Sequence, residues 1–308
     1  MMVGHAALAF ALAAWAAAIL GLSRERALAV GVAAGAFAAV PDVDMGYAVV
    51  GLARAFQDGG SFPEVFWETG NVVHRGVTHS LLVGGVTATL FGLVAYRGRL
   101  RLAGVVGLCS LVVGAIPVLG WLEATVMVIF VAAGLAVALT SRWMGLSPRA
   151  TLAAALVGVL SHPFGDMFTG TAPELLYPLD VHLLPQRLLL SSDPTLHLLG
   201  TFGLELTAIW LAAAVYLHLN GRHVLGYVHR RAVLGAGYVG AVLALPPPTL
   251  SVSYHFVFSV LAVGLVGVVD LPVPDLRSPK SRRGVAVTGL AAVTIAWLTY
   301  IVGYLLVA

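Results

Sequence analysis

The chain has 308 residues, of which 59% are hydrophobic and only 10% are charged. Soluble domains contain about 45–50% apolar residues, so this composition excludes a soluble enzyme with a single membrane anchor and predicts an integral membrane protein. The formal net charge of +3 does not indicate a nucleic-acid partner, because the basic residues are spread over short loops.

Long apolar runs recur along the whole chain, and a run of about 20 residues is enough to cross a bilayer as a helix. We therefore predict an all-α fold, a polytopic bundle of about ten transmembrane helices. We treat residues 1–308 as one membrane domain, in which residues 1–185 carry the motifs and residues 197–308 carry none. The second helix is short and could continue past Asp44 towards Val50. In chain order, the helices are predicted at residues 3–21, 27–41, 79–96, 102–118, 122–140, 151–168, 197–218, 232–247, 253–270 and 285–306.

Basic residues gather in alternate loops between these helices. Of the 17 Lys and Arg residues, only Arg54, Arg75 and Arg187 lie outside one set of alternate loops. Short cytoplasmic loops carry an excess of Lys and Arg, so we predict that the basic set faces the cytoplasm and that both termini lie outside. A cysteine at position 60 would then be labelled from outside the cell, and one at position 280 only from inside.

Three polar motifs lie at helix ends on the predicted extracytoplasmic face of the cell membrane. Carboxylates and imidazoles are ligands for divalent metals, and such groups are costly near lipid. Cys109 is the only cysteine, which disfavours a thiolate site. We therefore predict a His/Asp metal site. The motifs are Pro41-Asp42-Val43-Asp44, His74-Arg75-Gly76-Val77-Thr78-His79-Ser80 and Ser161-His162-Pro163-Phe164-Gly165-Asp166.

The first and third motifs differ in how firmly their spacing fixes geometry. His162 and Asp166 are four residues apart, so on a helix they share one face and can hold one cation; the alternative is a hydrogen bond within the pair. Asp42 and Asp44 follow Pro41, where we expect an exposed turn. They can bind one metal, bridge two, or divide into a ligand and a general base, and the alternative is an interfacial helix stop.

The second motif needs a bend. His74 and His79 are five residues apart and do not share a helix face, so we expect Gly76 to provide the conformational freedom that aims both inward. Arg75 has a planar guanidinium suited to phosphate or carboxylate; the alternative is a salt bridge to an aspartate of the first motif. Thr78 could cap the following helix or hydrogen bond to a ligand.

Other histidines and carboxylates are weaker candidates. His5, near the external end of the first helix, is expected to be a ligand or a general acid/base. Asp180 and His182 lie in a long external loop and are second choices, with His197 below them. Glu205 lies inside a helix, where it should be protonated, paired or turned to the bundle interior.

Taken together, the PDVD, HRGVTHS and HPFGD motifs and a histidine in the first helix resemble the LexA-binding, inner-membrane-associated metal-dependent hydrolases. That family is distantly similar to the zinc-dependent phospholipase C and single-strand nuclease superfamily. The resemblance covers roughly residues 1–185. It implies that His162 and Asp166 match the His-x-x-x-Asp pair of that superfamily. It further implies ligands among Asp42 or Asp44 and His74 or His79, with His5 as the N-terminal histidine.

The resulting prediction is a membrane-embedded hydrolase with a divalent metal, expected to be Zn²⁺. No His-x-x-x-Glu pair accompanies the motifs, so one or two ions are expected rather than three. The ion would activate a water for attack on an ester or phosphoester. The expected metal ligands are Asp42, His79, His162 and Asp166. The expected catalytic residues are Asp44, His74 and His5, which would move protons, and Arg75, which would bind negative charge.

The expected position of the site, at the level of the lipid headgroups, favours a lipid or lipid-linked substrate; the sequence identifies no protein partner. Two alternatives use the same groups. A cation or small-solute transporter would normally hold its site near the membrane midplane within inverted repeats, and no repeat is visible here. A non-catalytic membrane partner would have a closed metal with no open coordination position.

Overall fold

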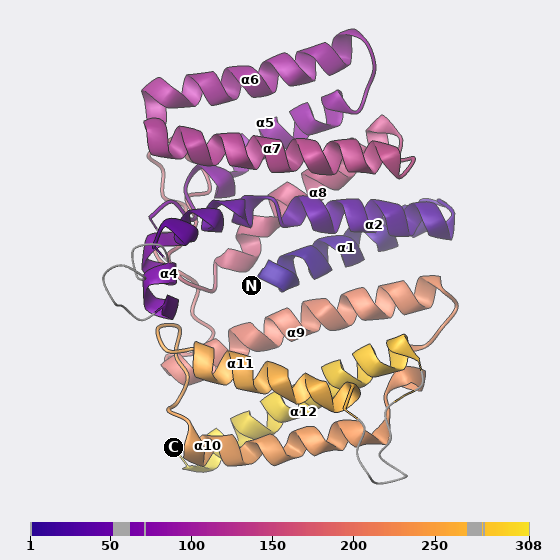
Figure 1. Cartoon of the computed structure of the whole chain (residues 1–308), viewed down its shortest axis with the longest axis vertical. Helices are drawn as coiled ribbons and strands as arrows, with labels where there is room; N and C mark the ends of the chain where they lie inside the picture. Colours follow the sequence, from indigo (N-terminus) through magenta and orange to yellow (C-terminus); the bar gives the residue numbers. More distant parts are fainter. Residues whose placement is uncertain (1, 52–61, 71, 270–278, 280, 308) are drawn as a thin grey trace. The chain divides into compact units, whose positions relative to one another are not determined.

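The computed structural model describes residues 2–51, 62–70, 72–269, 279 and 281–307. No residue in these ranges forms a β-strand, so the predicted all-α fold is confirmed over the described part of the chain (Figure 1). Contacts divide the chain into two compact units, Met1–Arg187 and Leu188–Ala308. Each unit is described by itself.

The first unit is built around α8, which packs against α1, α2, α5 and α7; α6 lies beside α5 and α7 (Figure 1). Described helices also occupy parts of residues 42–78, between the helices predicted at 27–41 and 79–96. They include α4, which at nine residues is too short to register as a membrane-length apolar run. The helices, with η for a 3₁₀ helix, are α1 (Met2–Ile19), α2 (Arg24–Ala38), η1 (Pro41–Tyr47), α4 (Phe62–Gly70), η2 (Val77–His79), α5 (Leu81–Val94), α6 (Arg99–Leu119), α7 (Trp121–Trp143) and α8 (Pro148–Asp166).

Serine caps set where three of these helices begin. Ser23 accepts from the backbone N–H of Arg26, and Ser147 accepts from that of Ala150. Ser80 accepts from the first turn of α5, at Leu82 and Val83. A hydroxyl at this position satisfies N–H groups that have no partner within the helix. Because Ser80 ends the HRGVTHS motif, its cap fixes the motif at the start of α5.

Small residues bring α8 close to α2. A Cβ at Gly158 would collide with the backbone of Ala34 and Ala38 and with Phe37. A Cβ at Gly35 would likewise collide with the carbonyl oxygen of Ala6 in α1. Glycines at helix contacts are typical of membrane proteins, where close backbone approach replaces burial from water as the source of packing energy. The close approach places the end of α8 beside η1.

The second helix continues beyond Pro41. This agrees with the prediction that it could extend past Asp44 towards Val50. Residues Arg24–Gly51 form one apolar 28-residue span that includes η1. The expectation of an exposed turn at Asp42 and Asp44 is wrong, since these residues are 6% and 1% exposed. Proline is compatible with the first position of a helix, where its missing N–H costs nothing, so Pro41 starts η1 instead of releasing the chain to solvent.

In the second unit, α12 packs against η4, η5, α9 and α11. Its core includes Phe202, Phe256 and Tyr300. The helix predicted at 232–247 is a 3₁₀ helix followed by one short α-helix. The elements are α9 (Pro194–Leu219), η3 (Val224–Tyr227), η4 (Arg230–Gly240), α10 (Ala241–Ala244), α11 (Tyr254–Ala262), η5 (Val263–Gly267) and α12 (Arg282–Val307).

The structure supports a membrane protein but not the predicted count of spans. Each of the ten predicted segments contains a helix, yet among the described residues five helical segments are long and apolar enough to cross a membrane. The shorter apolar helices are Val3–Ile19, Leu81–Val94 and Tyr254–Gly267. The five candidate spans are Arg24–Gly51, Arg99–Leu119, Trp121–Trp143, Pro194–Leu219 and Arg282–Val307.

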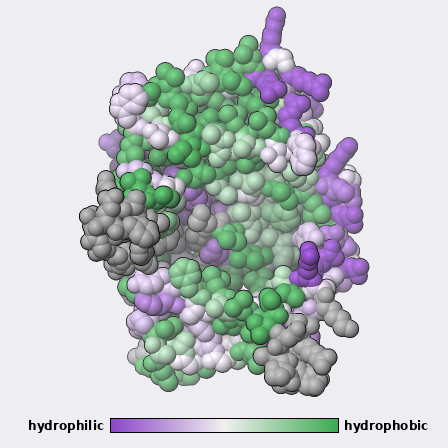
Figure 2. All heavy atoms as spheres, viewed as in Figure 1, coloured by the Kyte–Doolittle hydropathy of each residue, from purple (hydrophilic) through white to green (hydrophobic). Residues whose placement is uncertain are grey.

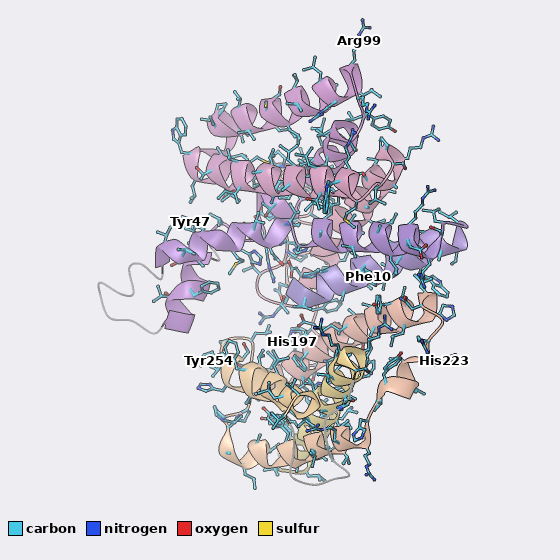
Figure 3. The ribbon with its side chains drawn as sticks, turned by 45° about the vertical axis from the view of Figure 1, so that its right-hand side comes forward. Phe10, Tyr47, Arg99, His197, His223 and Tyr254 are labelled. Atoms are coloured by element: carbon cyan, nitrogen blue, oxygen red, sulfur yellow. The ribbon has the colours of Figure 1, made fainter. Side chains whose placement is uncertain are left out.

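Polar and apolar surfaces of the first unit are segregated. Over this unit Figure 2 shows mostly hydrophobic residues along the helices and hydrophilic residues at the right-hand helix ends. Arg99, where α6 begins, and Tyr47, where η1 ends, lie at opposite ends of the unit (Figure 3). The second and third motifs lie before the start of α5 and at the end of α8, and Arg97 and Arg149 lie at the opposite ends of these two helices.

Candidate metal centre

The end of α8 contributes two of the four candidate ligands. His162 and Asp166 are one helical turn apart, so their side chains project from the same face. They are 0% and 2% exposed, and His162 Nε2 lies 3.4 Å from Asp166 Oδ2. Their spacing in the sequence predicts this shared face. In the structure the face points towards the interior of the unit.

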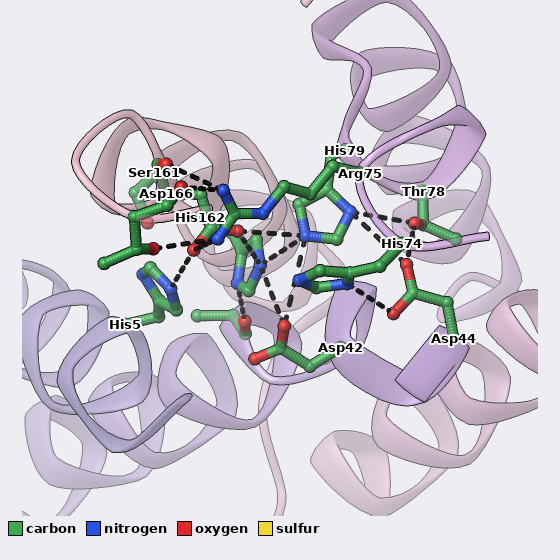
Figure 4. A network of polar contacts seen from close by, with 12 residues as sticks. His5, Asp42, Asp44, His74, Arg75, Thr78, His79, Ser161, His162 and Asp166 are labelled. Atoms are coloured by element: carbon green, nitrogen blue, oxygen red, sulfur yellow. Dashed lines mark hydrogen bonds and ion pairs between the residues drawn. The ribbon is translucent and has the colours of Figure 1, made fainter. Parts of the chain in front are cut away.

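The 3₁₀ helices η1 and η2 contribute Asp42 and His79. His79 Nε2 lies 3.0 Å from His162 Nε2 and 3.1 Å from Asp166 Oδ2. Asp42 Oδ1 lies 3.4 Å from His162 Nε2 and 4.0 Å from His79 Nε2. One ligand atom from each of these four residues lies within 4.8 Å of the other three (Figure 4). We call Asp42, His79, His162 and Asp166 the metal centre.

The hydrogen bonds of the two imidazoles indicate which ring nitrogen carries the proton. His162 Nδ1 lies 2.6 Å from the carbonyl oxygen of Ala38, which can only accept, so Nδ1 donates. Thr78 Oγ1 donates its only proton to Asp44 Oδ2 at 2.6 Å, so it accepts from His79 Nδ1 at 2.9 Å. In its neutral form each ring therefore has an unprotonated Nε2, and the two Nε2 atoms face each other.

The metal centre fits a divalent cation. Two imidazole lone pairs and two carboxylates converge, and Oδ2 of both Asp42 and Asp166 lacks a hydrogen-bond partner among the described residues. Bonds of about 2.0–2.2 Å to a tetrahedral ion separate the ligands by about 3.3–3.6 Å, close to the measured 3.0–4.0 Å. One proton would satisfy a single pair, whereas a cation satisfies all four ligands.

Asp166 is held from behind by two of the predicted catalytic residues. Its Oδ1 atom lies 3.2 Å from His5 Nε2 and 3.4 Å from Arg75 Nη2, which leaves Oδ2 for the metal centre. The His5 ring packs on Gly165, where a Cβ would collide with it, and its centroid lies 4.1 Å from that of His162. His5 and Arg75 therefore orient a ligand in this structure.

Arg75 also sets the bend of the second motif. Its φ is +72°, so the bend begins at Arg75, and it continues through Gly76, whose φ is −84° and whose ψ is −121°. A side chain at positive φ is strained unless its surroundings hold it. Arg75 Nη1 donates to the backbone oxygens of Asp166, Thr169 and Thr171, and Nη2 donates to Thr169 Oγ1 at 2.8 Å.

These contacts bear on the two predicted roles of Arg75. Its ion pair is with Asp166 and not with an aspartate of η1, and both terminal nitrogens already have protein acceptors. Burial lowers the pKa of Arg75, while the charge of Asp166 opposes that shift. The arrangement leaves Arg75 engaged with the protein instead of free to receive an anion.

Asp44 and His74 form a second group that shares His79 with the metal centre. Asp44 Oδ1 lies 2.9 Å from His74 Nδ1, and Asp44 Oδ2 accepts the hydroxyl of Thr78. The two aspartates of η1 therefore have different partners. Asp42 contacts His162, and Asp44 contacts His74. In Figure 4 the other nitrogen of His74 lies on the side of Asp42.

Of the weaker candidates, Asp180 and His182 lie outside the metal centre. Asp180 and His182 form an exposed pair, 3.2 Å apart. His197 and Glu205 belong to the second unit, where His197 Nδ1 accepts from the backbone N–H of Leu190.

Glu123 is a half-buried carboxylate in the first turn of α7, outside the three motifs. The sequence feature that could have drawn attention to Glu123 is the position of a carboxylate at the start of an apolar helix. The backbone carbonyl of Ala38 orients His162, and no motif predicts this contact because a backbone group leaves no signal in the residue types.

The comparison with known families identifies the chain. A family model described as "YdjM inner membrane protein" matches residues 1–245, which is more than half of the sequence. No curated protein and no solved structure gives a match. The matched description supports the inner-membrane part of the resemblance and mentions neither LexA nor hydrolysis. The chain belongs to the YdjM inner membrane protein family.

Proposed function

We propose that this membrane protein is a metal-dependent hydrolase that acts on a phosphoester or ester of a lipid or lipid-linked substrate at the extracytoplasmic face. One observation carries the proposal: the two Nε2 atoms and two carboxylates of the metal centre converge at separations that suit a tetrahedral ion, with Zn²⁺ expected. Both imidazoles are held at Nδ1 by protein acceptors, the arrangement that metal-binding histidines usually have.

The residues of the metal centre and its neighbours would have different roles in the proposed hydrolysis. When bound, a divalent ion would supply Lewis acidity that lowers the pKa of a water molecule towards 7. His5 and Arg75 would keep Asp166 in place. His74 would accept a proton at the nitrogen that Asp44 does not hold. Because the terminal nitrogens of Arg75 are taken by protein acceptors, negative charge on the substrate would be met by the cation.

The substrate class follows from the surroundings of the centre. The first unit carries exposed apolar side chains along its helices, and three residues of the metal centre lie just before α5 and at the end of α8. A site at the end of membrane helices meets the headgroup region, where the ester and phosphoester bonds of lipids lie. This placement supports a lipid or lipid-linked substrate over a soluble one.

A non-catalytic membrane protein with a structural metal is the second candidate, and one observation favours it. All four residues of the metal centre are at most 6% exposed, and together they can complete a tetrahedral shell. A closed shell has no open position for water. A hydrolase therefore requires that the ion accept a fifth ligand or that one carboxylate move aside.

Metal content and activity test both candidates. We expect the full-length protein in detergent to contain about one ion per chain, and His162→Ala/Asp166→Ala to contain none. The matched control is Asp180→Asn/His182→Ala, which removes an exposed Asp/His pair outside the centre and should keep the metal. A metal-free wild type with an intact fold would overturn the proposal.

A phosphodiesterase assay on the same samples separates the two candidates. Turnover that is lost with the metal supports the hydrolase. Bound metal without turnover on phosphodiester or ester lipids favours the structural role. Substitution with Co²⁺ adds an independent readout, because its visible spectrum changes when an added anion enters an open coordination position, and a closed shell leaves the spectrum unchanged.

A further inference from the structure

Asp44 is fully engaged by the protein and lies outside the metal centre. It is 1% exposed, Oδ1 lies 2.9 Å from His74 Nδ1, and Oδ2 accepts the hydroxyl of Thr78 at 2.6 Å. An ionised carboxylate acts as a general base through an oxygen that can reach the proton of the reacting water. Each oxygen of Asp44 already has a protein partner and the side chain is buried, so we expect its contribution to pass through the groups that it holds.

Thr78 connects Asp44 to the metal centre. The side chain is 1% exposed, and its oxygen lies 2.6 Å from Asp44 Oδ2 and 2.9 Å from His79 Nδ1. We infer that Thr78 and Asp44 are positioning residues that act on the metal through His79, whose Nε2 they keep unprotonated and aimed at the other three ligands. The inference rests on the proposed metal site but not on turnover.

The direction of the hydrogen bonds makes this chain of contacts specific. Asp44 only accepts, so the Thr78 proton points to it, and the Thr78 oxygen is then free to accept from His79 Nδ1. With its proton at Nδ1, His79 has a lone pair at Nε2, the atom 3.1 Å from Asp166 Oδ2. A residue without a hydroxyl at position 78 would leave His79 Nδ1 and Asp44 Oδ2 without this partner in a buried site.

Asp44 also links His79 to His74. The two imidazole rings lie edge to face with centroids 4.7 Å apart. Asp44 holds His74 directly, and it reaches His79 through Thr78 and through its own Oδ2, which lies 3.5 Å from His79 Nδ1. One carboxylate therefore orients a metal ligand and the ring that would accept a proton. The residues that touch metal or water would be His79 and His74, and Asp44 would act only through them.

Metal affinity of two Thr78 variants tests the inference. Thr78→Val keeps the shape and removes the hydroxyl, and we expect it to weaken Zn²⁺ binding about 10- to 100-fold, the usual effect of losing a partner of a metal-binding histidine. Thr78→Ser keeps a hydroxyl and should retain most of the affinity. The readout is calorimetric titration of the full-length metal-free protein in detergent with Zn²⁺ alone.

Thr87→Val is the matched control. Thr87 is 0% exposed and lies in the adjoining helix α5, but its hydroxyl contacts only the backbone oxygens of Val83 and Gly84. The control should bind Zn²⁺ like the wild type. Thermal unfolding of each metal-free protein distinguishes lost affinity from lost fold. If Thr78→Val fails to fold, the Thr78→Ser titration and the Co²⁺ spectrum of that variant provide the test.

A double-mutant cycle tests the path from Asp44. If Asp44 acts on the metal only through Thr78, then Thr78→Val/Asp44→Asn should lose no more affinity than the more damaging single variant. Additive losses would show a separate route and overturn that part of the inference. Wild-type affinity in a folded Thr78→Val protein would overturn all of it. Failure of the wild type to bind metal would instead overturn the proposed function, and this inference with it.

Discussion

Gly165 shows how a residue without a side chain shapes the metal centre. Its Cα lies so close to the imidazole of His5 that a Cβ would collide with the ring. We expect Gly165→Ala to push His5 away from Asp166 Oδ1, because the ring has to move to admit the methyl group. Asp166 would lose one of its two holding contacts, and Zn²⁺ affinity should fall about 10-fold in a calorimetric titration.

Gly85→Ala is the control for this change. Gly85 lies in α5, and a Cβ there would meet no atom within 4 Å. Alanine in an open helical position favours the helix by roughly 0.5–1 kcal/mol, so this variant should bind Zn²⁺ normally and unfold no earlier than the wild type. Equal affinities in both variants would contradict the role assigned to Gly165.

Sequence spacing predicts contacts between residues of one helix, and it fails for residues whose partner lies elsewhere. His162 and Asp166 share a face because the period of the helix requires it. The division of Asp42 from Asp44 depends on η1, a 3₁₀ helix that was predicted as an exposed turn. The pairing of Arg75 with Asp166 joins residues 91 positions apart, and neither sequence motif contains that information.

At the scale of helices, the contact between α8 and α2 positions the metal centre. Gly158 lies against the backbone of α2, and four residues later His162 donates to the carbonyl oxygen of Ala38 in the same helix. We expect Gly158→Ala to force the helices apart. Overpacking of this kind costs about 1–3 kcal/mol, which should lower the melting temperature of the metal-free protein in detergent.

The same substitution should weaken Zn²⁺ binding, since the Ala38 carbonyl moves with α2. Gly114→Ala in α6 provides the comparison, because a Cβ at Gly114 meets nothing within 4 Å. If neither Gly158→Ala nor Gly114→Ala changes the melting temperature, α2 and α8 can accommodate the extra methyl group. Their close approach would then not be required.

The apolar runs in the sequence predicted the positions of the helices well. They predicted the number of membrane-spanning helices less well. Every predicted segment contains a helix because a run of apolar residues bounded by serine, glycine or arginine has few other ways to satisfy its backbone near lipid. The count of ten rests on length, and α1 and α5 are shorter than a full span. Helix α4 was missed because nine residues lie below any membrane-length window.

At the scale of the whole molecule, the distribution of charge favours one orientation. In the first unit the motifs follow α2, precede α5 and end α8, whereas basic residues lie at the opposite ends of these helices: Arg24, Arg97 and Arg149. An excess of Lys and Arg marks cytoplasmic loops, so the proposed metal centre would face outwards. A zinc site on that face would take its substrate from the outer leaflet or from molecules carried there.

Cysteine labelling in intact cells tests this orientation. Positions 60 and 280 lie outside the described residues, so Asp180 and Arg149, both exposed, replace them. In a Cys109→Ser background, which removes the only native cysteine, we expect Asp180→Cys to react with a membrane-impermeant maleimide. Arg149→Cys should react only after the membrane is permeabilised. The reverse pattern would place the metal centre on the cytoplasmic side and leave its chemistry unchanged, because the four ligands and their hydrogen bonds do not depend on which side of the membrane they face.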